Sequence, residues 1–246
     1  RGGPAPSIHV FAPRAQLRIP QLAGLTQTPH AQRTHHDRYT RLRTDQAPPT
    51  HGEQTYPEIM SDIIIPGIGS LEPAPALDHL DLLAPPVAAA LTALAERGVA
   101  TASSALVVAI DPELADTEVM TREFGMDLAL SSNCILVAGK RAGEERIAAC
   151  VVRATTNADV NHVVKKRLDV RKASFWPQER AVEASGMEYG GITPVGVPDS
   201  WRLLIDSACS VGWSCIGSGL RRSKLFVTGE VLAALPGAEI VEGLGV

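Results

Sequence analysis

The stretch Met187–Gly196, with the sequence MEYGGITPVG, contains the most restrictive backbone pattern in this chain. Two adjacent glycines, Gly190 and Gly191, are followed by Pro194 and then by Gly196. Glycine permits positive φ and lets a ligand approach the backbone closely, and proline fixes the shape of a loop. The stretch therefore predicts a rigid loop that points main-chain N–H groups at a bound molecule.

The segments around this loop predict an α+β fold. Apolar runs bounded by turn residues predict strands, and apolar residues at helical spacing predict helices. The expected strands are 105–110, 134–138, 147–154, 175–176, 203–206, 213–216, 225–227 and 239–241, with a polar hairpin turn over 139–146. The expected helices are 86–97, 116–125 with a stop at Gly125, one capped by Asn157, one that begins at Pro177 and stops at Gly186, and 230–235. Many short strands interrupted by helices indicate a single domain with a mixed β-sheet or barrel-like core flanked by helices.

The first 59 residues differ in composition from the rest of the chain. They are rich in Pro, Gln, Thr, Arg and His and have no sustained apolar period. Such a segment buries too little apolar surface to offset the entropy lost on ordering. We therefore predict a disordered or non-native extension in residues 1–59 and a folded domain in residues 60–246. Met60 is a candidate start of the functional protein, and the arginine content of the extension resembles a transit peptide weakly.

The charge of the chain is unevenly distributed. Residues 1–59 hold seven arginines and four acidic residues, whereas residues 60–246 hold 16 basic and 23 acidic residues. An acidic domain is a poor general binder of nucleic acid, and we do not expect DNA as a partner. Two short stretches are nevertheless basic: Lys165, Lys166, Arg167, Arg171 and Lys172, and then Arg221, Arg222 and Lys224. Each stretch is either a solvated surface or a local track for phosphate groups.

Several kinds of functional site are absent from the sequence. It has no HExxH motif, no nucleophile elbow and no His–Cys–Cys zinc pattern, so we expect neither a metal nor a cofactor. The GSGLRRSK stretch at residues 217–224 lacks the spacing of a phosphate-binding P-loop. No run of about 18 apolar residues predicts a membrane span. The four cysteines form no CxxC pair, which favours reduced thiols and a cytoplasmic protein.

Four motifs follow one another in the second half of the chain. They are GMEYGGITPVG at 186–196, a strand ending at Asp206, IGSGLRRSKLFV at 216–227 and LPGAEIVEG at 235–243. In order and separation they resemble the YbaK/prolyl-tRNA editing domain family, with a motif core of about 111–243. The upstream segments GSLEPAPALDH and DPELADTEVM resemble an actinobacterial-type branch of that family. The resemblance implies an α+β domain that hydrolyses mischarged aminoacyl-tRNA.

The resemblance also implies a set of site residues. The family uses a GxxxP loop, here Gly190–Pro194, to hold the terminal adenosine and the ester carbonyl. It implies that Gly190 and Gly191 are catalytic, and that substrate contacts come from Ile192, Thr193, Pro194, Gly196, Asp206, Gly217, Ser218, Gly219 and Lys224. An aminoacyl ester is already activated, so a positioned water and N–H donors for the oxyanion suffice for hydrolysis. Two alternatives stay open: Asp206 caps a turn, and the glycines at 217 and 219 only form a tight turn.

One position departs from the family pattern. Family members usually carry a lysine before the hairpin, in a pattern like (F/V)KTLLV, and alignment on Ser132–Val137 puts Asn133 in its place. Asn133 can donate a neutral hydrogen bond, but it cannot supply a charge-assisted one. The nearby lysines are Lys140, expected in an exposed turn, and Lys224.

Three functions therefore stay open. The first is a deacylase that acts in trans on a small misacylated amino acid, with Asn133 as the catalytic donor and the stretch Lys165–Lys172 on the phosphates near the tRNA acceptor end. The second is a module that binds an aminoacyl or nucleotide end without catalysis. The third is a hydrolase of small amino-acid esters, in which the basic residues play no part.

Overall fold

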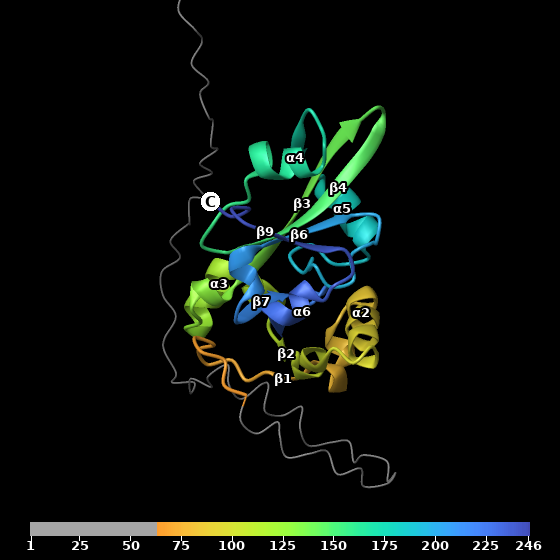
Figure 1. Ribbon diagram of the computed structural model, residues 1–246. Coiled ribbons are helices and arrows are strands. Elements are labelled where there is room, and N and C mark those ends of the chain that lie inside the picture. The colour runs from red at the N-terminus through yellow and green to blue at the C-terminus, as the bar shows by residue number, and fades with distance from the viewer. Residues whose placement is uncertain (1–62) are drawn as a thin grey trace, which may run out of the picture. The chain divides into compact units, whose positions relative to one another are not determined.

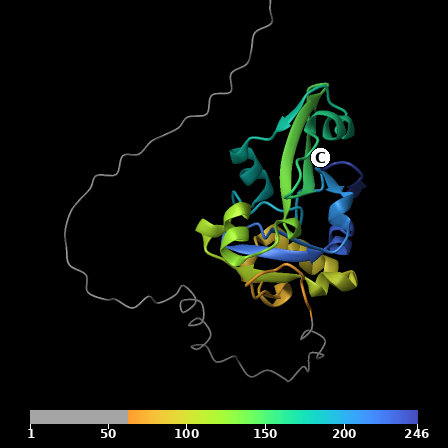
Figure 2. The same ribbon diagram turned by 90° about the vertical axis from the view of Figure 1, so that its left-hand side faces the viewer.

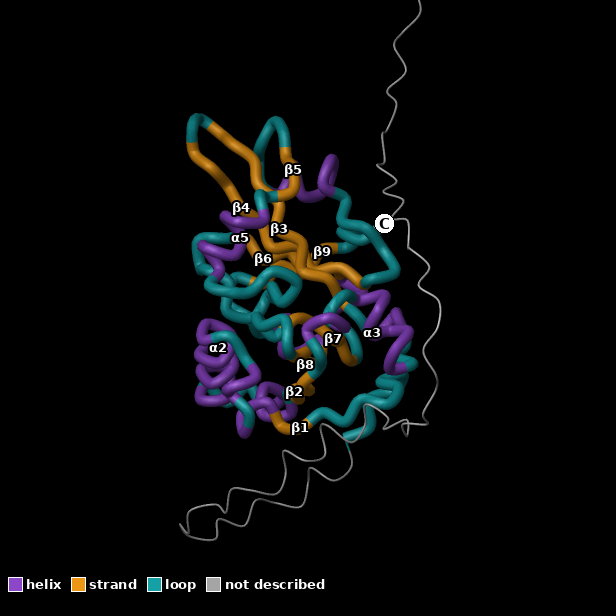
Figure 3. Tube along the Cα trace, turned by 180° about the vertical axis from the view of Figure 1, so that it is seen from behind, coloured by secondary structure: helices purple, strands orange, loops and turns teal. Residues whose placement is uncertain are grey.

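The strands form two sheets in residues 63–246, the part of the chain that this computed structural model describes (Figure 1). The four-stranded sheet contains β1 (Ala74–Pro75), β2 (Leu106–Ala109), β8 (Ser223–Thr228) and β7 (Trp213–Gly217), in that order and all antiparallel. The five-stranded sheet contains β5 (Ala173–Phe175), β3 (Ser132–Arg141), β4 (Glu144–Arg153), β6 (Arg202–Asp206) and β9 (Ala238–Val241). In the latter, β4–β6 and β6–β9 are parallel pairs and the others are antiparallel. The predicted α+β class with a mixed sheet is confirmed, although the strands divide between two sheets (Figure 3).

Helices connect and cover these strands. The α-helices are α2 (Pro85–Glu96), α3 (Thr117–Phe124), α4 (Lys165–Arg167), α5 (Gln178–Ser185) and α6 (Gly229–Ala233). As the sequence predicts, α3 and α5 each end at a glycine with positive φ, Gly125 and Gly186. No helix in residues 63–246 is long and apolar enough to cross a membrane. The predicted extension 1–59 and the candidate start at Met60 lie outside the described residues.

The β3–β4 hairpin is longer than its sequence predicts. The ladder continues until Arg141 pairs with Glu144, so residues 139–146, expected as a turn, are mostly strand. Only Ala142 and Gly143 form the turn, with φ of 52° and 87°. Two consecutive residues with positive φ match the type I′ turn, whose twist suits a two-residue hairpin. The polar end of the hairpin rises away from the rest of the domain (Figure 2), where backbone pairing continues without apolar side chains.

The helix expected after Asn157 begins later, because the C-terminus occupies the predicted cap. The backbone of Asn157 forms two hydrogen bonds of 2.9 Å with that of Val246. Asp159 caps the helical segment instead, and its carboxylate accepts a hydrogen bond from the N–H of His162 at 3.0 Å. The first turn, Val160–Val164, is a π-helix, and α4 follows directly. This long-range pairing is invisible to a local sequence pattern.

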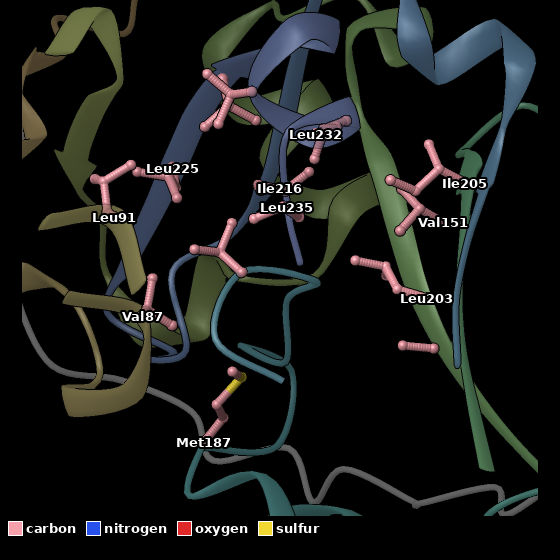
Figure 4. Close-up of a cluster of buried hydrophobic side chains, with 14 of the residues drawn as sticks. Val87, Leu91, Val151, Met187, Leu203, Ile205, Ile216, Leu225, Leu232 and Leu235 are labelled. Atoms are coloured by element: carbon pink, nitrogen blue, oxygen red, sulfur yellow. The ribbon is translucent and has the colours of Figure 1, made fainter. Parts of the chain in front are cut away.

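The main apolar core lies between the two sheets. Leu203 and Ile205 of β6 point into it, whereas Leu204 points to the opposite face, as the two-residue period of a strand requires. Figure 4 shows side chains of α2, β7, β8 and α6 facing β4 and β6 across this core. Smaller clusters cover the two outer faces, with α3 on the four-stranded sheet and the 160–170 segment on the five-stranded sheet.

Arg153, at the end of β4, ties the two sheets together. Its Nη1 donates to the carbonyl of Trp213 and to Oγ of Ser214, both at 3.0 Å, and so reaches β7. Its Nη2 donates to the carbonyls of Ala208 and Val211, both at 2.9 Å. One side chain thus binds two carbonyl groups of the connection between β6 and β7 and the first two residues of β7.

Replacement of this guanidinium tests its structural role. Arg153→Met removes the donors and leaves the partly buried carbonyl of Trp213 and hydroxyl of Ser214 without this partner, so we expect the free energy of unfolding to fall by about 1–3 kcal/mol. Denaturant unfolding measures the change. Arg171→Met, at an exposed arginine, is the control and should alter stability by less than about 0.5 kcal/mol. Equal stability of the two variants would contradict the role assigned to Arg153.

Candidate functional site

A cavity of about 350 Å³ opens where α3, the start of β3, β7 and the Met187–Gly196 loop meet. It brings together five residues that the sequence analysis singled out: Asn133, Gly190, Ile192, Gly217 and Lys224. Ligand pockets commonly span about 300–1,000 Å³, so this one suits a small group or the end of a larger molecule. Ser131 and Cys215 form a parallel bridge beside it, which joins the two sheets at the cavity.

The two glycine-rich loops hold each other in place through their backbones. The N–H of Glu188 donates to the carbonyl of Gly219, and the N–H of Gly219 donates to the carbonyl of Gly191, both at 2.8 Å. A Cβ added at Gly217 would overlap the carbonyl of Gly191. Gly219 also has φ of 82°, which favours glycine. The glycines at 217 and 219 therefore permit the close approach of the two loops.

The backbone of the Met187–Gly196 loop leaves three N–H groups free at residues that line the cavity. The N–H of Gly191 donates to the carbonyl of Glu188 at 3.0 Å, so it is not available to a ligand. Those of Tyr189, Gly190 and Ile192 have no partner within residues 63–246, and all three residues line the cavity. Thr193 and Pro194 are buried and do not line it. Of the two adjacent glycines, Gly190 thus has an N–H donor available to a ligand, whereas the N–H of Gly191 stabilises the turn of the loop.

Asn133 faces the cavity, and Thr117 orients its amide. The Oγ1 of Thr117 donates to Oδ1 of Asn133 at 3.4 Å, a weak bond that connects the first turn of α3 with β3. With the carbonyl oxygen engaged, the two N–H donors of the Asn133 amide remain for a ligand. Thr117, the first residue of α3, also lines the cavity.

Lys224 is buried at the cavity and 7% exposed. Leu225 and Val227 point into the main core, so the alternation of β8 turns Lys224 and Phe226 toward α3. Lys224 forms no salt bridge with any residue of the described part. Burial lowers the pKa of Lys224, and the neighbouring Arg221 lowers it further.

Other polar groups line the cavity without forming a recognisable catalytic pair. Burial raises the pKa of Cys134, and it raises the pKa of Cys215 to about 12, so both thiols are protonated at neutral pH. Ser131 is buried, and its Oγ has no partner among the described residues. No cluster of three or more metal-binding side chains occurs in residues 63–246. Nothing in the sequence around Ser131 or Cys215 marks them as cavity residues, because only the bridge between the sheets brings them here.

The mouth of the cavity combines an aromatic ring with an ion pair. Tyr189 lines the cavity and is 58% exposed. Beside it, the N–H of Arg221 donates to Oε2 of Glu188 at 2.6 Å, and Nη2 of Arg221 donates to Oδ1 of Asp116 at 3.2 Å. These residues come from three separate segments, and the sequence analysis named none of Tyr189, Asp116 or Glu188 as a site residue.

Besides Thr193, Pro194 and Gly219, three more predicted substrate-binding residues do not line the cavity. The two carboxylate oxygens of Asp206 accept hydrogen bonds from the N–H groups of Ala208 and Gly245, at 2.8 and 2.7 Å, so Asp206 caps a turn and holds the C-terminus. Ser218 shares a hydrogen bond of 2.7 Å with the hydroxyl of Ser223. Gly196 packs against the backbone of Pro86 with φ of 81°. Each of these residues stabilises an element that supports the site.

The basic stretch Lys165–Lys172 packs on the five-stranded sheet, and its end at Lys172 lies beside β3, some distance from the cavity. The carbonyl of Lys172 lies next to Gly139, six residues along the strand from Asn133, which corresponds to about 20 Å. Arg167 pairs with Glu239 at 3.1 Å. The other basic residues of the stretch form no salt bridge with a described residue: Lys165, Lys166, Arg171 and Lys172.

The second basic stretch does not form a solvated track. Arg221 pairs with Asp116, and Nη2 of Arg222 donates to the carbonyl of Asp81 at 2.6 Å. Lys224 is buried, so the three side chains face different environments. The side chains of a strand and of the turn before it point in different directions, so a local run of basic residues does not form one surface.

Comparisons with known proteins agree with this architecture. No curated protein matches the sequence significantly. A crystal structure described as "a putative trans-editing enzyme for prolyl tRNA synthetase" is 19% identical, with a TM-score of 0.52, over 65% of this chain and 97% of that chain. A structure from work on epitope backbone grafting onto scaffold proteins is 18% identical, with a TM-score of 0.52, over 67% of this chain and 99% of that chain. At such identities these two structures show a shared fold.

The family is shown by a match to the sequence itself. The model of the aminoacyl-tRNA editing domain matches residues 98–235, which is more than half of the 246 residues. This range holds the glycine loops, Asn133 and Lys224, and therefore the greater part of the cavity lining. The chain belongs to the aminoacyl-tRNA editing domain family.

Proposed function

We propose that this protein is an aminoacyl-tRNA deacylase that acts in trans and hydrolyses the ester of a small mischarged amino acid. The observation that carries this proposal is the cavity, which is lined by Asn133 and by Gly190 and Ile192 with their free N–H groups. The chain that forms this cavity belongs to the family of aminoacyl-tRNA editing domains. The ribose-linked end of the substrate would enter past Tyr189, and the aminoacyl group would occupy the cavity.

The reaction requires little from the protein beyond positioning and hydrogen-bond donors. Water attacks the ester carbonyl carbon, and negative charge develops on the carbonyl oxygen. The N–H groups of Gly190 and Ile192 and the amide of Asn133 stabilise that charge. The bond from the carbonyl carbon to the ribose oxygen then breaks, and the proton of water passes to that oxygen, with the vicinal ribose hydroxyl as a relay. The products are the free amino acid and uncharged tRNA.

The lining of the cavity favours a small apolar amino acid. Met120 and Ile135 supply apolar side chains, while Gly190 and Gly217 bring bare backbone to the wall. Bare backbone cannot move aside for a larger group, so an extra methylene would meet resistance. Pockets of this type discriminate by about 10–200-fold per methylene.

A charged tRNA as substrate also implies a binding partner and a place in the cell. Tyr189 offers an exposed aromatic face on which the terminal adenine can stack. The basic residues about 20 Å along β3 would then contact backbone phosphates of the acceptor stem and not the terminal nucleotide. We therefore propose the tRNA acceptor end as the partner and the cytoplasm, where charged tRNA is used, as the location.

The loop geometry makes Gly191 the sharpest test of the deacylase proposal. A Cβ at Gly191 would lie 2.7 Å from the carbonyl carbon of Leu220, so Gly191→Val must displace the loop. We expect the wild type to release alanine or another small amino acid from one member of a panel of mischarged tRNAs, and the variant to lose at least about 100-fold in rate. Ala184→Val, at an exposed position of α5 that does not line the cavity, is the control. Binding of tRNA by the wild type without any cleavage would refute the deacylase and favour the binding module.

The salt dependence of tRNA binding tests the basic stretch. Each phosphate contact contributes about 0.7–0.9 to the slope of log K against log salt concentration. We expect the triple variant Lys166→Gln, Arg171→Gln, Lys172→Gln to reduce that slope by about 2–3 without changing the rate of ester cleavage on bound tRNA. Arg97→Gln, at an exposed arginine on the end of α2, should leave the slope unchanged. An unchanged slope in the triple variant would favour a solvated surface.

A further inference from the structure

We propose that Lys224 is a catalytic residue whose ammonium group binds the ester oxyanion, so that the positive charge of this site comes from β8 and not from the start of β3. The inference rests on the proposed deacylase function. It gives the cavity a charge-assisted donor although Asn133, at the start of β3, is neutral.

The position of Lys224 places its side chain at the reacting end of the cavity. Lys224 pairs with Gly217 in the β7–β8 ladder. A Cβ at Gly217 would in turn overlap the carbonyl of Gly191 and approach that of Ile192 to 2.8 Å. Lys224 therefore lies on the side of the cavity where Gly190 and Ile192 have their free N–H groups.

No residue of the described part of the chain forms a salt bridge with this ammonium group, although the more distant Asp116 raises its pKa. The acidic neighbour Asp116 is engaged by Arg221 at 3.2 Å, and its side chain is 64% exposed. From β7, Cys215 faces Lys224 as a protonated thiol, and Cys134 on β3 is protonated as well. A buried ammonium without a counter-ion destabilises a fold, and such groups persist chiefly where a ligand completes them. The oxyanion that forms during ester hydrolysis would be the counter-ion of the Lys224 ammonium group.

The chemistry favours the oxyanion over the phosphate of the terminal nucleotide. A phosphate is bulky and permanently charged, and it would stay near water, at the mouth with Tyr189 and Arg221. Lys224 is 7% exposed and belongs to the buried wall. At so buried a position a charged donor strengthens most as charge develops on the carbonyl oxygen, because the protein interior screens that charge weakly. Lys224 keeps its proton throughout and acts by attraction alone.

The first test replaces the charge with a side chain of similar length. Lys224→Met should lower kcat of deacylation by about 100-fold while KM for the mischarged tRNA changes by less than about threefold. Its Tm should be equal or higher, because an unpaired buried charge is removed. Lys140→Met, at an exposed lysine on the hairpin, is the matched control and should retain full activity. A large rise in KM with unchanged kcat would assign Lys224 to a phosphate and overturn the proposal, and so would a loss of activity that follows a loss of Tm.

The second test asks whether the charge itself matters. Burial and the neighbouring Arg221 lower the pKa of Lys224. The alkaline loss of activity should therefore begin at a lower pH than it would if the site depended on an ordinary lysine, whose pKa is about 10.4. Lys224→Arg stays charged, so its alkaline decline should move to higher pH after subtraction of uncatalysed ester hydrolysis. The double variant Asn133→Lys, Lys224→Met should have a kcat at least about tenfold higher than that of Lys224→Met alone. If both variants decline at the same pH and the added lysine restores nothing, the proposal is wrong.

The two proposals fail in distinguishable ways. If the wild type cleaves no mischarged tRNA, the deacylase function is refuted, and the catalytic assignment of Lys224 falls with it. If the wild type is active and Lys224→Met matches it, only the assignment of Lys224 is refuted.

Discussion

The close backbone contact between the Glu188–Ile192 segment and the Gly217–Gly219 turn holds the site in shape. Two hydrogen bonds of 2.8 Å join the loops, and the absence of side chains at Gly217 and Gly219 allows that approach. The contact uses the N–H of Gly219, while the turn within the first loop uses that of Gly191. Which amides remain free for a ligand is therefore a consequence of how the loops satisfy each other.

The cavity lining includes two polar groups that lack a partner. The Oγ of Ser131 is buried without a hydrogen-bond partner, and Lys224 is buried without a salt bridge among the described residues. Asp206, with two N–H donors, and Arg153, with several carbonyls, are engaged, whereas the Nε1 of Trp176 and the Oγ1 of Thr193 also lack a partner within residues 63–246. Unsatisfied groups lower stability, and those that line a cavity fit a binding site that a ligand completes.

Local sequence patterns predicted the elements better than their limits. Helix ends at Gly125 and Gly186 were correct because a glycine in the left-handed region ends a helix without help from distant residues. The hairpin turn was predicted to be longer than it is, because polar side chains do not end a strand whose backbone remains paired. The cap at Asn157 was wrong, since Val246 binds that backbone from the other end of the domain.

The sequence by itself determined the α+β class, the family motifs and the presence of a glycine loop with a fixed shape, because these depend on the residues' own conformational preferences. The tertiary structure decided that Gly190 and Ile192 keep free N–H groups, that Asp206 is a structural cap, and that Lys224 is buried at the cavity while Lys140 is exposed. Hydrogen-bond partners and burial are set by strands and loops that meet across the whole domain. They follow from long-range packing, which residue spacing along the chain does not encode.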